Sequence, residues 1–298
     1  MTVMTHPVAG EHPALITHSR RPVDPGQVCA QLVSPLRWRV EQVTVTGSTN
    51  ADLAGAAPSL ESGQVRTAEE QLTGRGRSGR DWFCPPGAGL MFSALLRLPQ
   101  VPADRRGWTG ALLGLAVVHA IDDAVGDDKQ LRISLKWPND VLIDGRKCAG
   151  ILGELVADAV VVGAGINISL CADELPRADA TSLLLAGGTP AGGSVDAPQL
   201  PAWLDRSRLL AGILDGFGDL LDRWVAAEGD VDVSGIRAEY LGICSTVGAT
   251  VRLILPGGAE RVVRAMDVGA DGGLITEDDA GRRTAYSAAD VVHLRPGG

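Results

Sequence analysis

The dipeptide Asp144-Gly145 constrains the fold of this chain more than any other short stretch of its sequence. It joins two strand-like runs, LRISLKWPNDVLI before it and RKCAGILGELV after it. In a two-residue connection, Asp-Gly favours a turn with both residues at positive φ, and such a turn makes the flanking strands antiparallel neighbours. We therefore predict a sheet with antiparallel strands in the middle of the chain.

Further strands and helices are predicted on both sides of this hairpin. Val43 and Val45 alternate with polar residues, which is typical of a strand, and a short helix capped by Ser48 or Thr49 should follow. The other predicted elements are a buried strand at 90–99, an apolar helix at 107–126, a strand at 159–170 and an amphipathic helix at 203–227.

The chain changes character near Gly242, where short strands begin to alternate with glycine-containing turns. Four or five strands in so short a segment favour a small antiparallel β-barrel. We predict an α+β fold, in which a mixed β-sheet packed with helices is followed by this barrel. The predicted divisions are a mobile N-terminal tail at 1–40, a catalytic domain at 41–236 and the barrel domain at 240–298.

Charge and cysteine content exclude several classes of protein. A net charge of −9 and a pI near 5.0 disfavour a broad nucleic-acid-binding or membrane-binding surface. The five cysteines show neither metal-ligand spacing nor a disulfide framework, and no signal peptide or uninterrupted membrane-spanning stretch is visible. We predict a cytoplasmic protein without membrane attachment, and the sequence leaves any metal site unknown.

Against this acidic background, the stretch TGRGRSGRDW concentrates three arginines among three glycines. Guanidinium groups and unobstructed backbone N–H groups could converge there on one anion, such as a triphosphate or a carboxylate. The stretch matches neither a Walker loop nor a dinucleotide-binding fingerprint. Taken alone, it is equally consistent with a solvated Arg-Gly segment.

Three other motifs carry polar groups suited to ligand binding. In LKWPND, Lys136 ends a strand, where it either extends into solvent or lies beside an anion, and Asp140 either binds magnesium or caps the turn. In VGAGINIS, glycines would allow a ligand or another strand to approach the backbone closely, and Asn167 could bind a base or a phosphate. The stretch GSTN offers small donors and acceptors.

Taken in order, GSTN, AEEQLTGRGRSGRDW, LKWPNDV, GRKCAGILGE and VGAGINIS resemble the biotin protein ligases. The resemblance covers roughly residues 41–298 and includes the small β-module. It implies an ATP-dependent ligase that makes biotinyl-5′-adenylate, releases pyrophosphate and transfers biotin to a lysine of the biotin carboxyl carrier domain of acyl-CoA carboxylases. Its expected substrates are biotin and ATP, with Mg²⁺ as the metal of the nucleotide.

The resemblance also implies roles for individual residues. Lys136, Arg77 and Arg75 are expected to be catalytic, with Lys136 at the reacting carboxylate. The expected biotin site comprises Ser48, Thr49, Asn50, Gln71, Gly74, Arg75, Gly76, Arg77 and Lys136, and the expected nucleotide site comprises Arg75, Arg77, Trp82 and Asn167.

Two departures and two alternatives complete the prediction. Bifunctional relatives carry an N-terminal winged helix-turn-helix, whereas only a short, proline-broken segment precedes GSTN, so we predict no DNA binding. Lipoate ligases share the adenylate chemistry but lack the GRGRxGR loop. An RNA-binding module without catalysis would require further interleaved aromatic or basic residues near the loop, and beyond the loop the chain shows no such interleaving.

Overall fold

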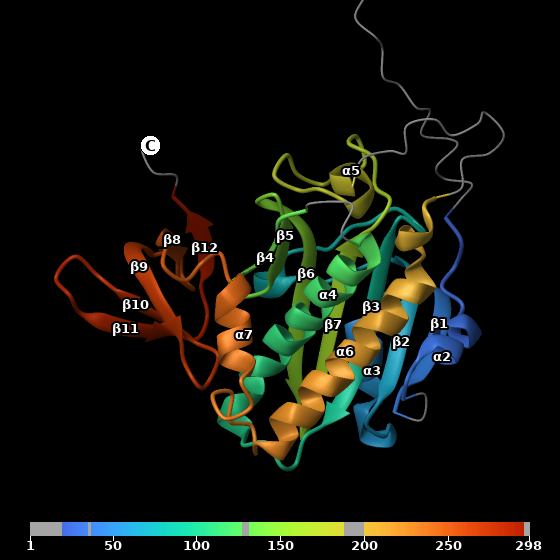
Figure 1. Ribbon diagram of the computed structural model, residues 1–298, viewed down its shortest axis with the longest axis horizontal. Helices are drawn as coiled ribbons and strands as arrows, with labels where there is room; N and C mark the ends of the chain where they lie inside the picture. Colours follow the sequence, from blue (N-terminus) through green and yellow to red (C-terminus); the bar gives the residue numbers. More distant parts are fainter. Residues whose placement is uncertain (1–19, 35–36, 127–130, 188–199, 295–298) are drawn as a thin grey trace, which may run out of the picture.

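The computed structural model describes residues 20–34, 37–126, 131–187 and 200–294, which form two β-sheets and the helices packed on them (Figure 1). The larger sheet has seven strands in the order β1-β2-β3-β7-β6-β5-β4. Only β1 and β2 pair in parallel, so the predicted mixed sheet is confirmed. Its strands are β1 (Arg39–Thr46), β2 (Gln64–Gln71), β3 (Gly89–Arg97), β4 (Ile133–Lys136), β5 (Asp140–Ile143), β6 (Arg146–Val156) and β7 (Ala159–Asn167).

The turn at Asp144-Gly145 forms as predicted. Ile143 pairs with Arg146 across the β5–β6 ladder, so two residues make the connection. The φ angles of Asp144 and Gly145 are +49° and +76°, as a turn with two positive φ angles requires. The hairpin pairs β6 with β5, and Lys147, Gly150 and Ile151 of β6 contribute to the candidate site.

Helices cover the two faces of the larger sheet unequally (Figure 1). On one face lie α4 (Thr109–Val125) and α6 (Arg206–Ala226), whose apolar side chains form the main core with Phe92, Val162 and Ile166 of the sheet. On the other face, α3 (Thr49–Ala56) packs Leu53 against Leu95 and Val161. The short α3 leaves most of this second face open to a ligand.

Helix α4 is apolar because it is a core helix. Together with the preceding 3-10 turn, Ala103–Val125 is long and apolar enough to cross a membrane, but 61% of its most apolar window is buried inside the protein. Leu112, Leu113 and Ile121 are completely buried between the sheet and α6. Packing against two layers accounts for its composition.

The second sheet contains five antiparallel strands in the order β11-β10-β9-β8-β12, so the predicted antiparallel β-module is confirmed. Among the described residues, its hydrogen-bonded ladder is open between β11 and β12. Helix α7 (Ile236–Ile243) precedes this module. Its strands are β8 (Thr250–Ile254), β9 (Glu260–Val268), β10 (Leu274–Glu277), β11 (Arg283–Tyr286) and β12 (Asp290–His293).

Two tryptophans of the larger domain attach this module. Trp108 Nε1 donates to Gly269 O at 2.9 Å, and Trp137 Nε1 donates to Gly272 O at 2.9 Å. Apolar residues of both sheets belong to one continuous buried core. The predicted division between 236 and 240 falls at the start of α7 and stays a prediction.

The prediction of a mobile tail at 1–40 is wrong for its C-terminal part. Asp24 caps the N-terminus of helix α2 (Pro25–Gln31), because its side chain accepts from Gly26 N. The helix packs on α6. Val28 is fully buried, and Arg20 forms an ion pair with Glu174 at 2.6 Å. Buried apolar side chains and long-range ion pairs order this segment, which its prolines alone did not indicate. Residues 1–19 lie outside the described part of the chain.

Candidate active site

Glycines on the open face of the sheet form the floor of a pocket. A Cβ at Gly165 would lie 2.4 Å from the ring of Trp82, and one at Gly150 would lie 2.9 Å from the same ring. A Cβ at Gly163 would lie 2.3 Å from Asn50 Oδ1. The glycines of VGAGINIS therefore allow side chains above the sheet to approach the backbone closely, and the approach of a ligand to them stays a prediction.

The pocket has a volume of about 360 Å³, which is the size of a small-molecule site. Five cationic residues and one carboxylate, Asp81, line it, although the whole chain has a net charge of −9. This concentration of positive charge favours an anionic ligand. The cationic residues are Arg75, Arg77, Arg80, Lys147 and Arg177.

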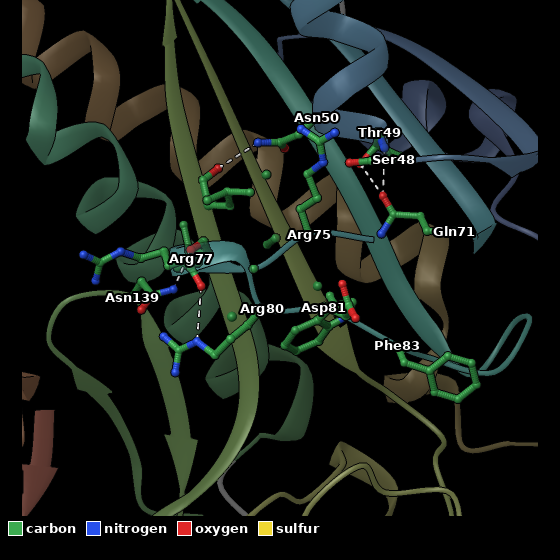
Figure 2. A pocket seen from close by; sticks show the side chains of 18 of the residues that line it. Ser48, Thr49, Asn50, Gln71, Arg75, Arg77, Arg80, Asp81, Phe83 and Asn139 are labelled. Carbon is green, nitrogen blue, oxygen red and sulfur yellow. Dashed lines mark hydrogen bonds between the residues drawn. The ribbon is translucent and has the colours of Figure 1, made fainter. Parts of the chain in front are cut away.

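One end of the pocket presents small neutral groups. Ser48 caps α3, and the Thr49 amide N donates to Gln71 Oε1 at 2.8 Å (Figure 2). This bond fixes the orientation of the Gln71 side-chain amide, whose oxygen is used by Thr49. The amide nitrogen Nε2 donates to Met91 Sδ at 3.4 Å and has a second hydrogen for another acceptor. The predicted residues Ser48, Thr49 and Gln71 thus come together from the start of α3 and the end of β2.

The glycine-arginine stretch forms a narrow loop over this pocket. Trp82 N donates to Gly74 O at 2.9 Å and Gly76 N donates to Arg80 O at 2.7 Å, so the loop closes on itself. Gly74 does not line the pocket. A Cβ there would lie 2.3 Å from Trp82 O, so Gly74 is required for loop closure.

The arginines of the loop point in different directions (Figure 2). Arg75 extends toward Asn50 and Thr49, whereas Arg77 and Arg80 lie on the side of Asn139. Burial lowers the pKa of Arg77, and its Nη1 has no hydrogen-bond partner among the described residues. Arg80 Nη2 instead binds Asp290 Oδ1 of β12 at 2.7 Å, which connects the loop to the second sheet.

Lys147 lines the pocket, whereas the predicted Lys136 is not among the lining residues, although it pairs with Asp140 on the same face of the sheet, and its role at the reacting carboxylate stays a prediction. Lys136 ends β4 as expected, but burial lowers its pKa and its side chain does not line the pocket. Lys147 Nζ binds Asp140 Oδ1 at 2.5 Å and lies 5.6 Å from the ring centroid of Trp82. Asp140 therefore pairs with a lysine, a role that neither predicted alternative included.

The opposite end of the pocket contains Asn167, at the end of β7. Its Nδ2 donates to Thr181 O at 2.9 Å, whereas its buried Oδ1 has no partner among the described residues. Trp82 Nε1 is likewise buried and unpaired. Buried polar atoms usually have partners, so these atoms indicate a polar ligand that completes them.

Nine of the eleven predicted site residues line this pocket, and the lining also includes residues that were not predicted, among them Lys147, Ser93 and Arg177. Lys147 stands in the quoted motif GRKCAG, but periodicity gave no reason to prefer it over Lys136. Ser93 lies in the apolar strand β3, where nothing in the sequence marks it as different from its neighbours. Only the pairing of β3 with β7 brings its hydroxyl to the pocket.

No resident metal centre is evident in the described ranges, where no group of three or more His, Cys, Asp or Glu could hold an ion. The pocket carboxylate Asp81 and the nearby Asp140 come from separate segments, and Asp140 is paired with Lys147. The residues present therefore fit a metal that arrives with a phosphate ligand, since Mg²⁺ commonly uses one or two carboxylates plus substrate phosphates.

Comparison with known proteins agrees with this site. Residues 42–169 match the biotin/lipoate A/B protein ligase family. The chain is 37% identical over 280 residues to the biotin–[acetyl-CoA-carboxylase] ligase of Mycobacterium tuberculosis, covering 93% of this chain and 97% of that protein. It is 31% identical to the Paracoccus denitrificans protein of the same name, covering 82% and 96% respectively.

A solved structure shares the fold. The Aquifex aeolicus biotin protein ligase in complex with biotin and ATP aligns with a TM-score of 0.64 and 23% identity, covering 87% of this chain and 99% of that one. The matched family includes both biotin and lipoate ligases, and the extended sequence similarity is to biotin ligases. The chain belongs to the biotin protein ligase family.

Proposed function

We propose that this protein activates biotin with ATP and transfers the biotinyl group to a lysine of a carboxylase biotin carrier domain. One observation carries the proposal: a single pocket joins a small neutral polar end, a cationic centre and a buried unpaired acceptor. This order matches biotinyl-5′-adenylate, which has a neutral bicyclic ring, an acyl phosphate centre and a purine. The family relationship supports the same reaction.

The three parts of the pocket have separate tasks in this proposal. Thr49 and Gln71 bind the polar ring of biotin, since they present an acceptor and a donor side by side. Asn167 Oδ1 accepts from the exocyclic amine of adenine. The glycine floor admits the ligand between these ends, and Trp82 contacts the nucleotide.

Positive charge accelerates the first step. An oxygen of the biotin carboxylate attacks the α-phosphorus of ATP, the bond to the β-phosphate oxygen breaks, and pyrophosphate leaves. Two anions must approach each other, so electrostatic stabilisation is the main contribution of the protein. Arg75, Arg77 and Lys147 provide it from the loop and from β6.

The second step needs positioning more than charge. The uncharged amine of the carrier lysine attacks the acyl carbon of the adenylate, AMP leaves, and the amine loses a proton to solvent as the amide forms. Because the adenylate is an activated mixed anhydride, holding the reactants in place and excluding water are sufficient for acyl transfer. A glycine-rich loop over the pocket suits both tasks.

Three further features are part of the proposal. Mg²⁺ enters with ATP and neutralises phosphate charge. The enzyme acts in the cytoplasm, where carrier domains and ATP occur. DNA is not a partner, and a gel-shift at physiological salt that shows sequence-specific binding would contradict this.

Pyrophosphate release tests the proposal directly. The protein, biotin, ATP and Mg²⁺ should release pyrophosphate, and lipoate in place of biotin should not support this reaction. Addition of a carrier domain should produce a biotinylated lysine detectable by mass spectrometry, with a Lys→Arg carrier as the matched control. Release that does not depend on biotin would reject the proposed function.

A further inference from the structure

A chain of hydrogen bonds connects the pocket to a carboxylate at its edge. Glu154 Oε2 accepts from Asn50 Nδ2 at 2.9 Å, and Asn50 Oδ1 accepts from Ser93 Oγ at 2.5 Å. Ser93 Oγ lies 2.8 Å from Thr49 Oγ1, which faces the pocket. The chain crosses from β6 through α3 to β3 and returns to the first residue of α3.

The orientation of the Asn50 amide is fixed at one end of this chain. Its Nδ2 donates both to Glu154 and to Leu152 O, at 2.9 and 3.2 Å. Both amide hydrogens are therefore used, and Asn50 is 5% exposed. Asn50 was predicted to contact biotin, but its donors point at the sheet instead.

The fixed amide determines the direction of the next bonds. Asn50 Oδ1 only accepts, so the Ser93 hydroxyl must donate its hydrogen to it. Ser93 Oγ then has only lone pairs left for Thr49, whose hydroxyl hydrogen points either to Ser93 or to Gln71 Oε1 at 3.1 Å. In both cases, Thr49 Oγ1 presents lone pairs to the pocket.

We propose that Glu154 and Ser93 are positioning residues that make Thr49 an obligatory acceptor, so that the site selects a ligand ring carrying an N–H donor. Gln71 complements this choice, because its Oε1 is held by Thr49 N and its Nε2 remains as a donor. The site therefore matches a ring with an N–H beside a carbonyl oxygen. This inference rests on the proposed function and extends it to the origin of ring selectivity.

A purely structural role for the same bonds makes a different prediction. If the chain only fastens α3 to the sheet, its loss lowers stability and weakens every ligand equally. If it sets hydrogen-bond polarity, its loss changes the preference between two ligands that differ only in donor and acceptor. The ratio of affinities therefore separates the two roles.

The experiment compares biotin with two ring analogues, in each of which oxygen replaces one ring N–H. Calorimetry gives the Kd of each ligand, and pyrophosphate release gives KM for biotin and for ATP. In the unaltered protein, one analogue should bind about ten- to a hundredfold more weakly than biotin, because its ring oxygen faces another acceptor. That ratio is the quantity followed in the variants.

Three variants change the chain, one at Ser93 and two at Glu154. Ser93→Ala removes the nearer acceptor for the Thr49 hydrogen and leaves only the longer contact to Gln71 Oε1 at 3.1 Å, so the preference for biotin should fall by up to about tenfold. Glu154→Lys replaces an acceptor with a donor and favours the reversed Asn50 amide, so the preference should fall by a similar factor. Glu154→Gln retains an acceptor oxygen and should restore most of the preference.

Asp158→Lys provides the matched control, because it makes the same charge change at an exposed residue beside the end of β6. The KM for ATP should not change in any variant by more than the control shows. An affinity ratio that stays constant in both Ser93→Ala and Glu154→Lys would overturn the inference, and if Ser93→Ala fails to fold, the Glu154 pair decides it. Absence of biotin binding and pyrophosphate release in the unaltered protein would instead reject the proposed function.

Discussion

The replacement of Lys147 by alanine tests which lysine acts on the reacting anions. Lys147 lines the pocket with its side chain 29% exposed, and its only ion pair among the described residues is with Asp140. A charge-assisted hydrogen bond contributes about 1.5–3 kcal/mol. At 1.36 kcal/mol per tenfold, we expect kcat/KM for adenylation to fall about 13- to 160-fold.

Lys136→Ala provides the comparison, because Lys136 lies opposite Asp140 on the same face of the sheet but is not among the residues that line the pocket, and without direct contact it would act on the ligand only through space. An interaction of that kind contributes about 0.2–1 kcal/mol, or about fivefold at most. Initial rates of pyrophosphate release at varied biotin and ATP give both parameters for each variant. Thermal melts verify that each variant is folded.

A third variant separates charge from local repulsion. Lys147→Ala leaves the Asp140 carboxylate without its partner, and this carboxylate could repel the phosphates. The double variant Lys147→Ala, Asp140→Asn removes that charge, and we expect it to stay at least tenfold below the unaltered protein. A loss in Lys136→Ala as large as that in Lys147→Ala would refute the reasoning and support the sequence-based assignment.

Three further predictions follow from the pocket, the loop and the thiols. Gly165→Ala places a Cβ 2.4 Å from the Trp82 ring and should weaken ATP binding at least tenfold in calorimetry. Gly153→Ala is the control, since its Cβ would have no neighbour within 4 Å, and equal effects in the two variants would contradict the close packing at Gly165. Asp290→Ala removes the partner of Arg80 at 2.7 Å, so trypsin should cleave the loop faster than in Asp232→Ala, while the free energy of unfolding changes by no more than about 1 kcal/mol. Burial raises the pKa of the Cys84 and Cys148 thiols to about 12, so at pH 8 iodoacetamide should modify Cys29 first and these two only in denaturant; mass spectrometry that finds Cys84 modified as fast in the native protein would contradict this.

Much of the fold follows from local sequence signals. The turn at Asp144-Gly145 forms because this dipeptide readily adopts two positive φ angles. The strand at 39–46 and the helix after Ser48 follow from alternation and capping, which act over a few residues. The order of the quoted motifs also identified the family. Each motif is a short contiguous stretch of sequence, so it can be recognised without knowledge of the fold.

The sequence failed where distant segments had to be compared. The segment at 20–34 contains two prolines and little periodicity, yet Arg20 pairs with Glu174 and Val28 enters the core. Such contacts join residues more than a hundred positions apart, and local pattern contains no information about them. Tertiary packing overrides the composition of this segment.

The sequence by itself determined that glycines, arginines and small polar residues gather in five ordered motifs, whose resemblance to the biotin protein ligases predicts a ligase that binds anions. The tertiary structure alone decided which side chains of those motifs face the pocket. Lys136 pairs with Asp140, which pairs with Gly150 of the pocket floor, so both lysines lie on the ligand side of the sheet, but of the two only Lys147 is among the residues that line the pocket. Tertiary packing also joined Glu154, Asn50, Ser93 and Thr49 into one hydrogen-bond chain. These residues come from β6, α3 and β3, so the direction of their hydrogen bonds depends on contacts that no single segment of sequence contains.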